Sequence, residues 1–253
     1  MSALLEVSDV SVNFGGLVAL DSINLEVRER QVVGLIGPNG AGKTTLFNVI
    51  SGLQSATSGR IVFDGSDISG LPAPARARAG IRRSFQNLGL MQDQSVSVNV
   101  SAGLHLTVGY RALDPVLRPW RWRQGEAAID ESVTNVLTQF GLERFRDQQV
   151  ADLSFGAARF VELASILVAQ PRLLLLDEPT TGLDMAERDR LRTAIKARPD
   201  RQTILLIAHD AAFVMDLCDW VYVLARGQML FAGRPEVVRE NPMVIEAYLG
   251  KGA

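Results

Sequence analysis

The spacing of apolar residues divides the chain into predicted strands and helices. Alternation of apolar and polar residues over 5–7 and 23–27 predicts half-buried antiparallel strands near the N-terminus. Apolar runs at 31–36, 173–176 and 204–208 predict buried strands. A strand at 58–65 closes on an Asp-Gly turn, and a hairpin is predicted from 221–224 and 228–231.

Apolar residues three and four positions apart predict the helices. This spacing recurs at 46–50, 126–140 and 157–169, and further helices are predicted at 185–197, bounded by Pro199, and at 235–249. Ser154 is placed to cap the helix that follows it. The Trp and Arg cluster at 120–123, next to Pro115 and Pro119, predicts a loop before the helix at 126–140. Buried strands that alternate with helices indicate the α/β fold class.

A phosphate-binding loop joins the buried strand at 31–36 to the next helix. The residues that fit its pattern are Gly37, Pro38, Asn39, Gly40, Ala41, Gly42, Lys43, Thr44 and Thr45. Backbone N–H groups and the positive end of a helix dipole surround one anion in such a loop. We expect Lys43 to contact the β- and γ-phosphates and the Thr44 hydroxyl to hold Mg²⁺. The motif predicts binding of a nucleoside triphosphate.

Titratable residues follow two other buried strands. Asp177 and Glu178 end one strand, and His209 ends the next. Ligands of α/β sheets bind at the carboxyl ends of strands, so these groups are expected to meet the nucleotide. Asp177 would bind Mg²⁺ directly or through water, and Glu178 would act as general base on the attacking water. His209 would contact the γ-phosphate or hold Glu178 and the water, and a purely structural histidine is the alternative.

Three features allow two interpretations each. Phe14, beside Gly15 and Gly16, is either a loop anchor or a platform for a nucleobase. The segment 72–83 carries four arginines and is either a solvated helix face or a patch that meets a partner. The two Trp of 120–123 are either core anchors or a stacking surface for nucleic acid.

Composition narrows the function only a little. The 253 residues carry a net charge of −2, which gives no general attraction to nucleic acid. Cys218 is the only cysteine, so an internal disulfide is excluded. No apolar run approaches the roughly 18 residues that span a bilayer, and the N-terminus lacks the pattern of a secretory signal. A membrane role would therefore be peripheral.

The ordered motifs resemble the ATP-binding-cassette ATPases, the nucleotide-binding subunits of ABC transporters. Besides the phosphate-binding loop and the strand-end residues, they include Gln86 as loop glutamine, 153–156 as signature segment and 181–184 as D-loop. The resemblance implies a P-loop NTPase (RecA-like) core with an N-terminal antiparallel β subdomain and an inserted helical subdomain. Residues 1–253 would form a single ABC ATPase domain, with 1–94 and 158–253 as core and 95–157 as the helical subdomain.

The resemblance also assigns roles at the site. It implies that ATP and Mg²⁺ are the cofactors, that Phe14 stacks on adenine, and that Gln86 senses both Mg²⁺ and the γ-phosphate as a catalytic and metal-binding residue. It further implies a head-to-tail dimer. In that dimer Ser154 and Gly156 of one subunit close over the nucleotide of the other.

Four segments resemble, more narrowly, the ATPases of branched-chain amino acid importers: 14–17, 80–87, 244–250 and the long stretch between Gln86 and the signature segment. This resemblance implies a second ATPase subunit, identical or related, together with transmembrane permease subunits and, indirectly, a solute-binding protein. It places the protein peripherally at the cytoplasmic face of the inner (plasma) membrane, with the stretch from Gln86 to Val100 docking the permease and with no nucleic-acid partner. Another solute such as urea or an amide is the alternative cargo.

The signature segment departs from the family pattern. Phe155 replaces a glycine, and Ala157 stands where the family has glutamine. Loss of that side-chain amide predicts a weaker composite site and, with a different partner subunit, two unequal sites. A regulatory module without hydrolysis is the alternative, although Lys43, Glu178 and His209 argue against it. A DNA or ribosome ATPase is disfavoured because the chain lacks a second cassette and a long coiled coil.

Overall fold

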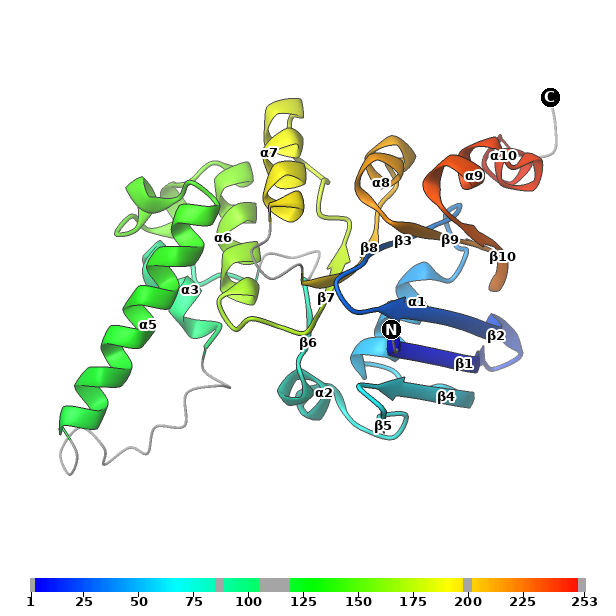
Figure 1. Ribbon diagram of the computed structural model, residues 1–253, viewed down its shortest axis with the longest axis horizontal. Helices are drawn as coiled ribbons and strands as arrows, with labels where there is room; N and C mark the ends of the chain where they lie inside the picture. The colour runs from blue at the N-terminus through cyan, green and yellow to red at the C-terminus, as the bar shows by residue number, and fades with distance from the viewer. Residues whose placement is uncertain (1–2, 85–88, 105–118, 198–201, 250–253) are drawn as a thin grey trace. The chain divides into compact units, whose positions relative to one another are not determined.

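The computed structural model describes residues 3–84, 89–104, 119–197 and 202–249 (Figure 1). Contacts divide the chain into two compact units. Unit 1 comprises Met1–Arg83, Arg172–Thr181 and Arg198–Ala253, and unit 2 comprises Ser84–Pro171 and Gly182–Ala197. Within the described ranges, no helix has both the length and the apolar character needed to cross a membrane.

Unit 1 contains an antiparallel sheet near the N-terminus. Its strand order is β2-β1-β4-β5, and these strands span Leu17–Arg28, Ala3–Phe14, Ser58–Phe63 and Ser66–Asp67. The predicted strands are confirmed, and β1 and β2 extend beyond the alternating stretches to a turn at Gly15 and Gly16. Both glycines have positive φ, 54° and 103°, which glycine adopts without a Cβ clash.

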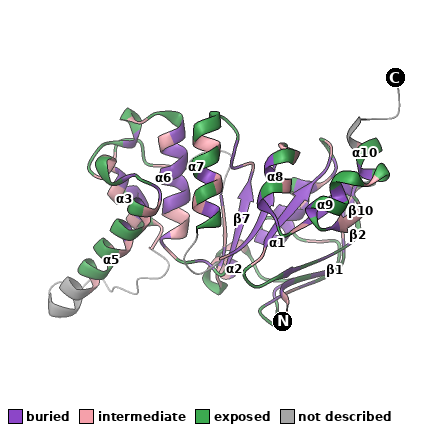
Figure 2. Ribbon diagram, turned by 45° about the horizontal axis from the view of Figure 1, so that its top comes forward, coloured by how far each residue is buried: buried purple, intermediate pink, exposed green. Residues whose placement is uncertain are grey.

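The second sheet of unit 1 is mainly parallel. Its order is β10-β9-β3-β8-β7-β6, with strands Gln228–Gly233, Trp220–Ala225, Val32–Ile36, Thr203–Ile207, Leu173–Asp177 and Ile81–Arg83. Only β10 pairs antiparallel, with β9. Every residue of β3, β7 and β8 is buried, which confirms the prediction from the apolar runs, and Figure 2 shows this burial along β7.

The helices of unit 1 are α1, α2, α8, α9 and α10, at Lys43–Ser51, Ala73–Ala79, Ala211–Leu217, Pro235–Glu240 and Pro242–Leu249. α8 lies against β3 because Gly34 has no side chain: a Cβ there would collide with Val214 and lie 3.1 Å from the buried Cys218 sulfur. The predicted helical tail is two helices, since Pro242 cannot continue α9 but suits the first turn of α10.

Unit 2 is helical in its described residues. It contains α3, α5, α6 and α7 at Val96–Ala102, Pro119–Gln139, Phe155–Leu167 and Met185–Lys196, with 3₁₀ turns at Glu143–Phe145 and Val150–Asp152. α3 and α5 both pack on α6. At the end of α3 the backbone of Gly103 approaches the Ser165 carbonyl so closely that a Cβ would collide with it. The Phe140 and Phe160 rings lie 5.8 Å apart between their centroids.

The start of α5 differs from the prediction. The predicted loop at 120–123 is wrong, because α5 already begins at Pro119, and proline is compatible with the first turn of a helix. Unit 2 includes α6 and α7 besides α3 and α5. The helical subdomain at 95–157 stays a prediction. The assignment of the chain to one ABC ATPase domain stays a prediction.

The arginines of 72–83 do not form one solvated helix face. Arg76 on α2 is only 2% exposed. Its guanidinium donates to the Val49 and Ile50 carbonyls at the end of α1, at 2.6 and 2.9 Å, and to the Leu71 carbonyl at 2.8 Å. A cation at a helix C-terminus complements the helix dipole, so Arg76 stabilises the end of α1. Burial lowers the pKa of this guanidinium from its usual value.

Candidate active site

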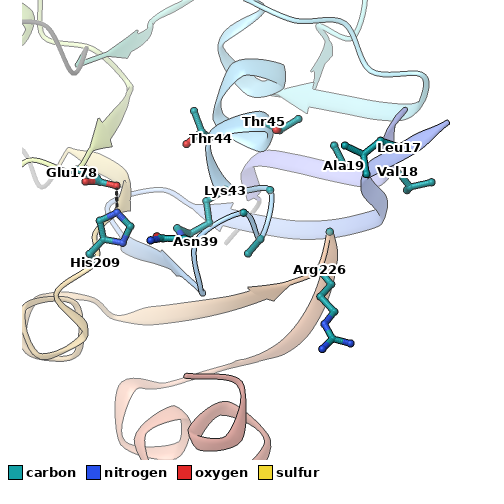
Figure 3. Close-up of a pocket in the computed structure, with 14 residues that line it drawn as sticks. Leu17, Val18, Ala19, Asn39, Lys43, Thr44, Thr45, Glu178, His209 and Arg226 are labelled. Atoms are coloured by element: carbon teal, nitrogen blue, oxygen red, sulfur yellow. Dashed lines mark ion pairs between the residues drawn. The ribbon is translucent and has the colours of Figure 1, made fainter. Parts of the chain in front are cut away.

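A cavity of about 620 Å³ in unit 1 collects residues from distant parts of the chain. Most of the phosphate-binding loop, from Asn39 to Thr45, forms one wall, and Glu178 and His209 line the cavity from the ends of β7 and β8. Figure 3 shows these groups around the loop. The volume lies within the range of small-molecule sites, roughly 300–1,000 Å³. The structure thus brings together the three strand-end features that were predicted to meet.

The loop is shaped by glycines that other residues cannot replace without strain. Gly40 and Gly42 have φ of 76° and 103°. A Cβ on Gly42 would lie 2.7 Å from the Ala19 carbonyl oxygen, whereas a Cβ on Gly40 would meet no atom within 4 Å. Gly42 precedes α1 and offers no side-chain cap. The N-cap residue therefore provides no side-chain acceptor for the first N–H groups of α1.

Lys43 is held inside the loop. Its side-chain nitrogen donates to the carbonyls of Gly37 and Pro38, at 2.6 and 3.0 Å, and the residue is only 6% exposed. Burial lowers the pKa of the Lys43 ammonium, and the nearby charges of Glu178 and Asp177 partly oppose that shift. Because desolvation outweighs these two carboxylates, the buried ammonium would be stabilised by an added anion.

Glu178 and His209 form a contact across the ends of two parallel strands. The His209 Nε2 lies 2.5 Å from the Glu178 Oε1, drawn as the dashed line in Figure 3. The Glu178 N–H donates to the Ile207 carbonyl at 2.8 Å, so the strand pairing continues up to the carboxylate. The Thr181 hydroxyl donates to the second Glu178 oxygen at 3.2 Å. Glu178 also has φ of 49°, an uncommon conformation that turns the chain at the end of β7.

Asp177 lies deeper than Glu178. It is 2% exposed, and its Oδ2 accepts from the Arg83 Nη2 at 2.7 Å. Thr44, the other predicted magnesium ligand, lines the cavity from the first turn of α1. A hydroxyl and a carboxylate are oxygen donors of the kind that Mg²⁺ prefers alongside phosphate oxygens, so the residues present fit this ion.

Several predicted residues lie outside this cavity wall. Phe14 is 51% exposed at the end of β1, opposite Leu17 in the hairpin, and Leu17, Val18 and Ala19 line the cavity instead. Gln86 lies outside the described residues. Ser154 and Gly156 belong to unit 2, where the Ser154 hydroxyl caps α6 by accepting from the Ala157 N–H at 3.2 Å. The roles assigned to all four stay predictions.

Sequence reasoning missed two parts of the wall. No role in ligand binding was predicted for the hairpin residues 17–19, although they lie just after the predicted Phe14 platform. Arg226 and Gly227 come from the β9–β10 turn, which no motif marks. The Gly227 N–H donates to the Ala41 carbonyl at 3.0 Å, and this bond ties the turn to the phosphate-binding loop. Contacts between segments so far apart in sequence follow from sheet order, which local patterns do not reveal.

Comparisons with known proteins agree with this geometry. The family model described as ABC transporter matches residues 20–181. The chain is 40% identical over 250 residues, 98% of each chain, to the "High-affinity branched-chain amino acid transport ATP-binding protein BraF" of Pseudomonas aeruginosa. It is 37% identical, with the same coverage, to the corresponding protein LivG of Escherichia coli.

A solved structure has the same fold. The ADP conformation of MJ1267, an ATP-binding cassette of an ABC transporter, is 27% identical with a TM-score of 0.85. The match covers 99% of this chain and 100% of that one. A family match over more than half of the chain, together with relatives that cover nearly all of it, shows that the protein belongs to the ABC transporter family.

Proposed function

We propose that this protein is the ATP-hydrolysing subunit of an importer for branched-chain or related amino acids. The observation that carries the proposal is the cavity in which the Lys43 loop faces the Glu178–His209 pair. The names of BraF and LivG, relatives at 37–40% identity over 98% of the chain, support the solute class.

The loop binds the phosphates of ATP. The N–H groups at the start of α1 point at the anion, and the helix dipole favours its negative charge. Lys43 exchanges the carbonyls of Gly37 and Pro38 for the β- and γ-phosphate oxygens. Leu17 and Val18 offer apolar contact to the base or ribose, and Phe14 stacks on the adenine ring.

Thr44 and Asp177 would hold Mg²⁺, and Gln86 would be a further ligand. The ion would neutralise developing charge on the phosphates. Thr44 belongs to α1, and Asp177 is the last residue of β7. The buried position of Asp177 restricts its carboxylate to few orientations.

Glu178 and His209 orient the attacking water. The Glu178 carboxylate accepts a proton from water, as a general base that contributes about 10²–10⁴-fold to the rate. His209 holds this carboxylate through its Nε2 and lies where it can also reach the γ-phosphate. The Thr181 hydroxyl holds the second carboxylate oxygen, so the base is fixed from two sides.

The protein works with partners. A second ATPase subunit, identical or related, contributes a signature segment, and this chain contributes Ser154 and Gly156 in return. Permease subunits in the plasma membrane bind the ATPase from the cytoplasmic face, and a solute-binding protein delivers the amino acid. The site that uses this chain's signature, with Ala157 in place of glutamine, is the weaker of two when the partner is a different subunit.

Substitution of the base tests the hydrolytic mechanism. We expect Glu178→Gln to reduce ATP turnover of the protein assembled with its partner by about 10²–10⁴-fold while ATP binding persists. Glu29→Gln, which changes an exposed acid of the same unit, should leave turnover unchanged. Phosphate release measures the first property and calorimetric titration the second. An unchanged rate in Glu178→Gln would exclude this residue as the base.

Reconstitution tests the transport function. Proteoliposomes that carry the ATPase and its permease should hydrolyse ATP faster when the binding protein is loaded with leucine, isoleucine or valine. Stimulation by urea or an amide, and not by these amino acids, would contradict the solute assignment.

A further inference from the structure

Arg83 contacts the candidate magnesium-binding acid from inside unit 1. It is the last residue of β6, and its side chain is 9% exposed. The Nη2 donates to the Asp177 Oδ2 at 2.7 Å, and the Nη1 donates to the Asn48 Oδ1 at 2.6 Å. The guanidinium carbon lies 5.6 Å from the centroid of the Phe47 ring. One side chain thus joins β6, β7 and α1.

The position of Asn48 on α1 relates the Arg83 hydrogen bonds to Thr44. Asn48 is four residues after Thr44, so the two side chains lie on the same face of α1, one turn apart. Arg83 therefore ties the Asp177 carboxylate to the face of the helix that also presents the Thr44 hydroxyl. These two oxygen groups, from β7 and α1, are the proposed ligands of the divalent cation, with Asp177 acting directly or through water.

The shape of the Arg83 guanidinium indicates that it orients the Asp177 carboxylate as well as neutralising its charge. A guanidinium presents its N–H groups in a planar fork, and two nitrogens of Arg83 reach acceptors on two different elements. A lysine ammonium could supply the charge but not this fixed fork. Burial of both Arg83 and Asp177 limits the access of water to the hydrogen bond between them.

We propose that Arg83 is a positioning residue that orients Asp177 toward Thr44 and thereby sets the affinity of the nucleotide site for its divalent cation. This role rests on the proposed ATPase function. Arg83 is not among the residues that line the cavity. It acts through Asp177. Its hydrogen bond to Asn48 fixes the guanidinium, and with it the Asp177 carboxylate, relative to α1.

Arg82 offers a matched control. It precedes Arg83 in β6, and neighbouring side chains on a strand point to opposite faces of the sheet. Arg82 is partly buried like Arg83, and burial lowers its pKa. Replacing either arginine by methionine removes the same charge from the same strand, but only Arg83→Met removes the bonds to Asp177 and Asn48.

The test measures metal binding directly. Mn²⁺ serves as the probe, and its electron paramagnetic resonance signal reports binding to the ADP-loaded protein. We expect Arg83→Met to weaken Mn²⁺ binding at least tenfold, while ADP affinity in EDTA stays within twofold of the wild type. Arg82→Met should leave both affinities within twofold. With ATP and Mg²⁺, Arg83→Met should need more Mg²⁺ for half-maximal hydrolysis and recover most of its rate at saturation.

Asn48 provides a milder variant and a coupling test. Asn48→Ala should weaken Mn²⁺ binding severalfold in the wild type and have no further effect in Arg83→Met, because both act through one bridge. Arg83→Lys should fall between wild type and Arg83→Met. Asn48→Ala and Arg83→Lys allow the test even when Arg83→Met does not fold.

Three results would overturn the positioning role. They are unchanged Mn²⁺ binding in all Arg83 and Asn48 variants, equal weakening in Arg82→Met, and fully additive effects of Arg83→Met and Asn48→Ala. A wild-type protein that binds neither ADP nor Mn²⁺ would instead contradict the proposed function itself.

Discussion

The N-terminal ends of α1 and α7 use opposite solutions to the same physical problem. Both helices begin with backbone N–H groups that have no partner within the helix. At α7 the Asp184 carboxylate accepts from the Glu187 N–H at 2.8 Å, and the Glu187 carboxylate accepts from the Asp184 N–H at 3.1 Å. At α1 the N-cap is Gly42, and no side chain caps the helix.

The difference separates structural from functional helix ends. A cap such as that of α7 contributes about 1 kcal/mol to stability without any ligand. α1 forgoes this contribution and leaves its N–H groups for an anion, which restores the missing stabilisation when it binds. Stability at α1 should therefore depend on nucleotide, and stability at α7 should not.

Lys43→Met should cause the largest change, because it should abolish the stabilisation of the protein by ATP. A ligand at 100 times its Kd stabilises a protein by about 2.7 kcal/mol. We expect this gain from ATP in the wild type and its loss in Lys43→Met, because the buried cation that pairs with the phosphates is gone. Lys196→Met, in the last turn of α7, should keep the gain. Denaturant unfolding with and without ATP measures the gain in both variants. A full gain in Lys43→Met would contradict the idea that nucleotide stabilises the N-terminal end of α1.

Gly42→Ala should have a smaller effect, on the protein without nucleotide. The added Cβ would meet the Ala19 carbonyl oxygen at 2.7 Å, on a residue with φ of 103°. We expect a loss of about 1–3 kcal/mol in the free energy of unfolding, together with weaker ATP binding. Gly40→Ala has the same kind of φ but open space around its Cβ, so it should lose less. Equal losses would mean that backbone strain alone, and not the contact with Ala19, determines the result.

Glu187→Ala should have the smallest effect. It removes one half of the capping box at α7, and we expect a loss of about 0.5–1 kcal/mol in stability with no change in ATP affinity. Glu187→Gln retains an oxygen that can accept from the Asp184 N–H and should lose less. Chemical denaturation and nucleotide titration check the two properties. A change in ATP affinity in Glu187→Ala would break the contrast between the two helix ends.

Local patterns located the strands and the loop that carry the candidate site residues. The phosphate-binding loop, the strand ends at Asp177 and Glu178, and His209 were all placed from apolar runs and short motifs. These signals are local because a buried parallel strand needs continuous apolar residues, and the loop needs glycine at fixed positions. The Ser154 cap of α6 was predicted for the same reason and is confirmed.

Features that depend on packing were not accessible in this way. Arg76 and Arg83 lie in one arginine-rich stretch, yet one binds the end of α1 and the other binds Asp177. Their partners are 27 and 94 residues away in the sequence, so charge patterning could not assign them. The start of α5 was missed because a proline was interpreted as a loop marker, while it occupies the first turn of the helix.

The single cysteine gives the protein a practical property. Cys218 is packed beneath β3 against Gly34, and burial raises the pKa of its thiol, so little reactive thiolate forms near neutral pH. Thiol-reactive dyes should therefore label Cys218 poorly in the native protein. A cysteine introduced at an exposed position beside the cavity, such as that of Arg226, would be labelled efficiently without prior removal of Cys218 and would report ligand binding by fluorescence.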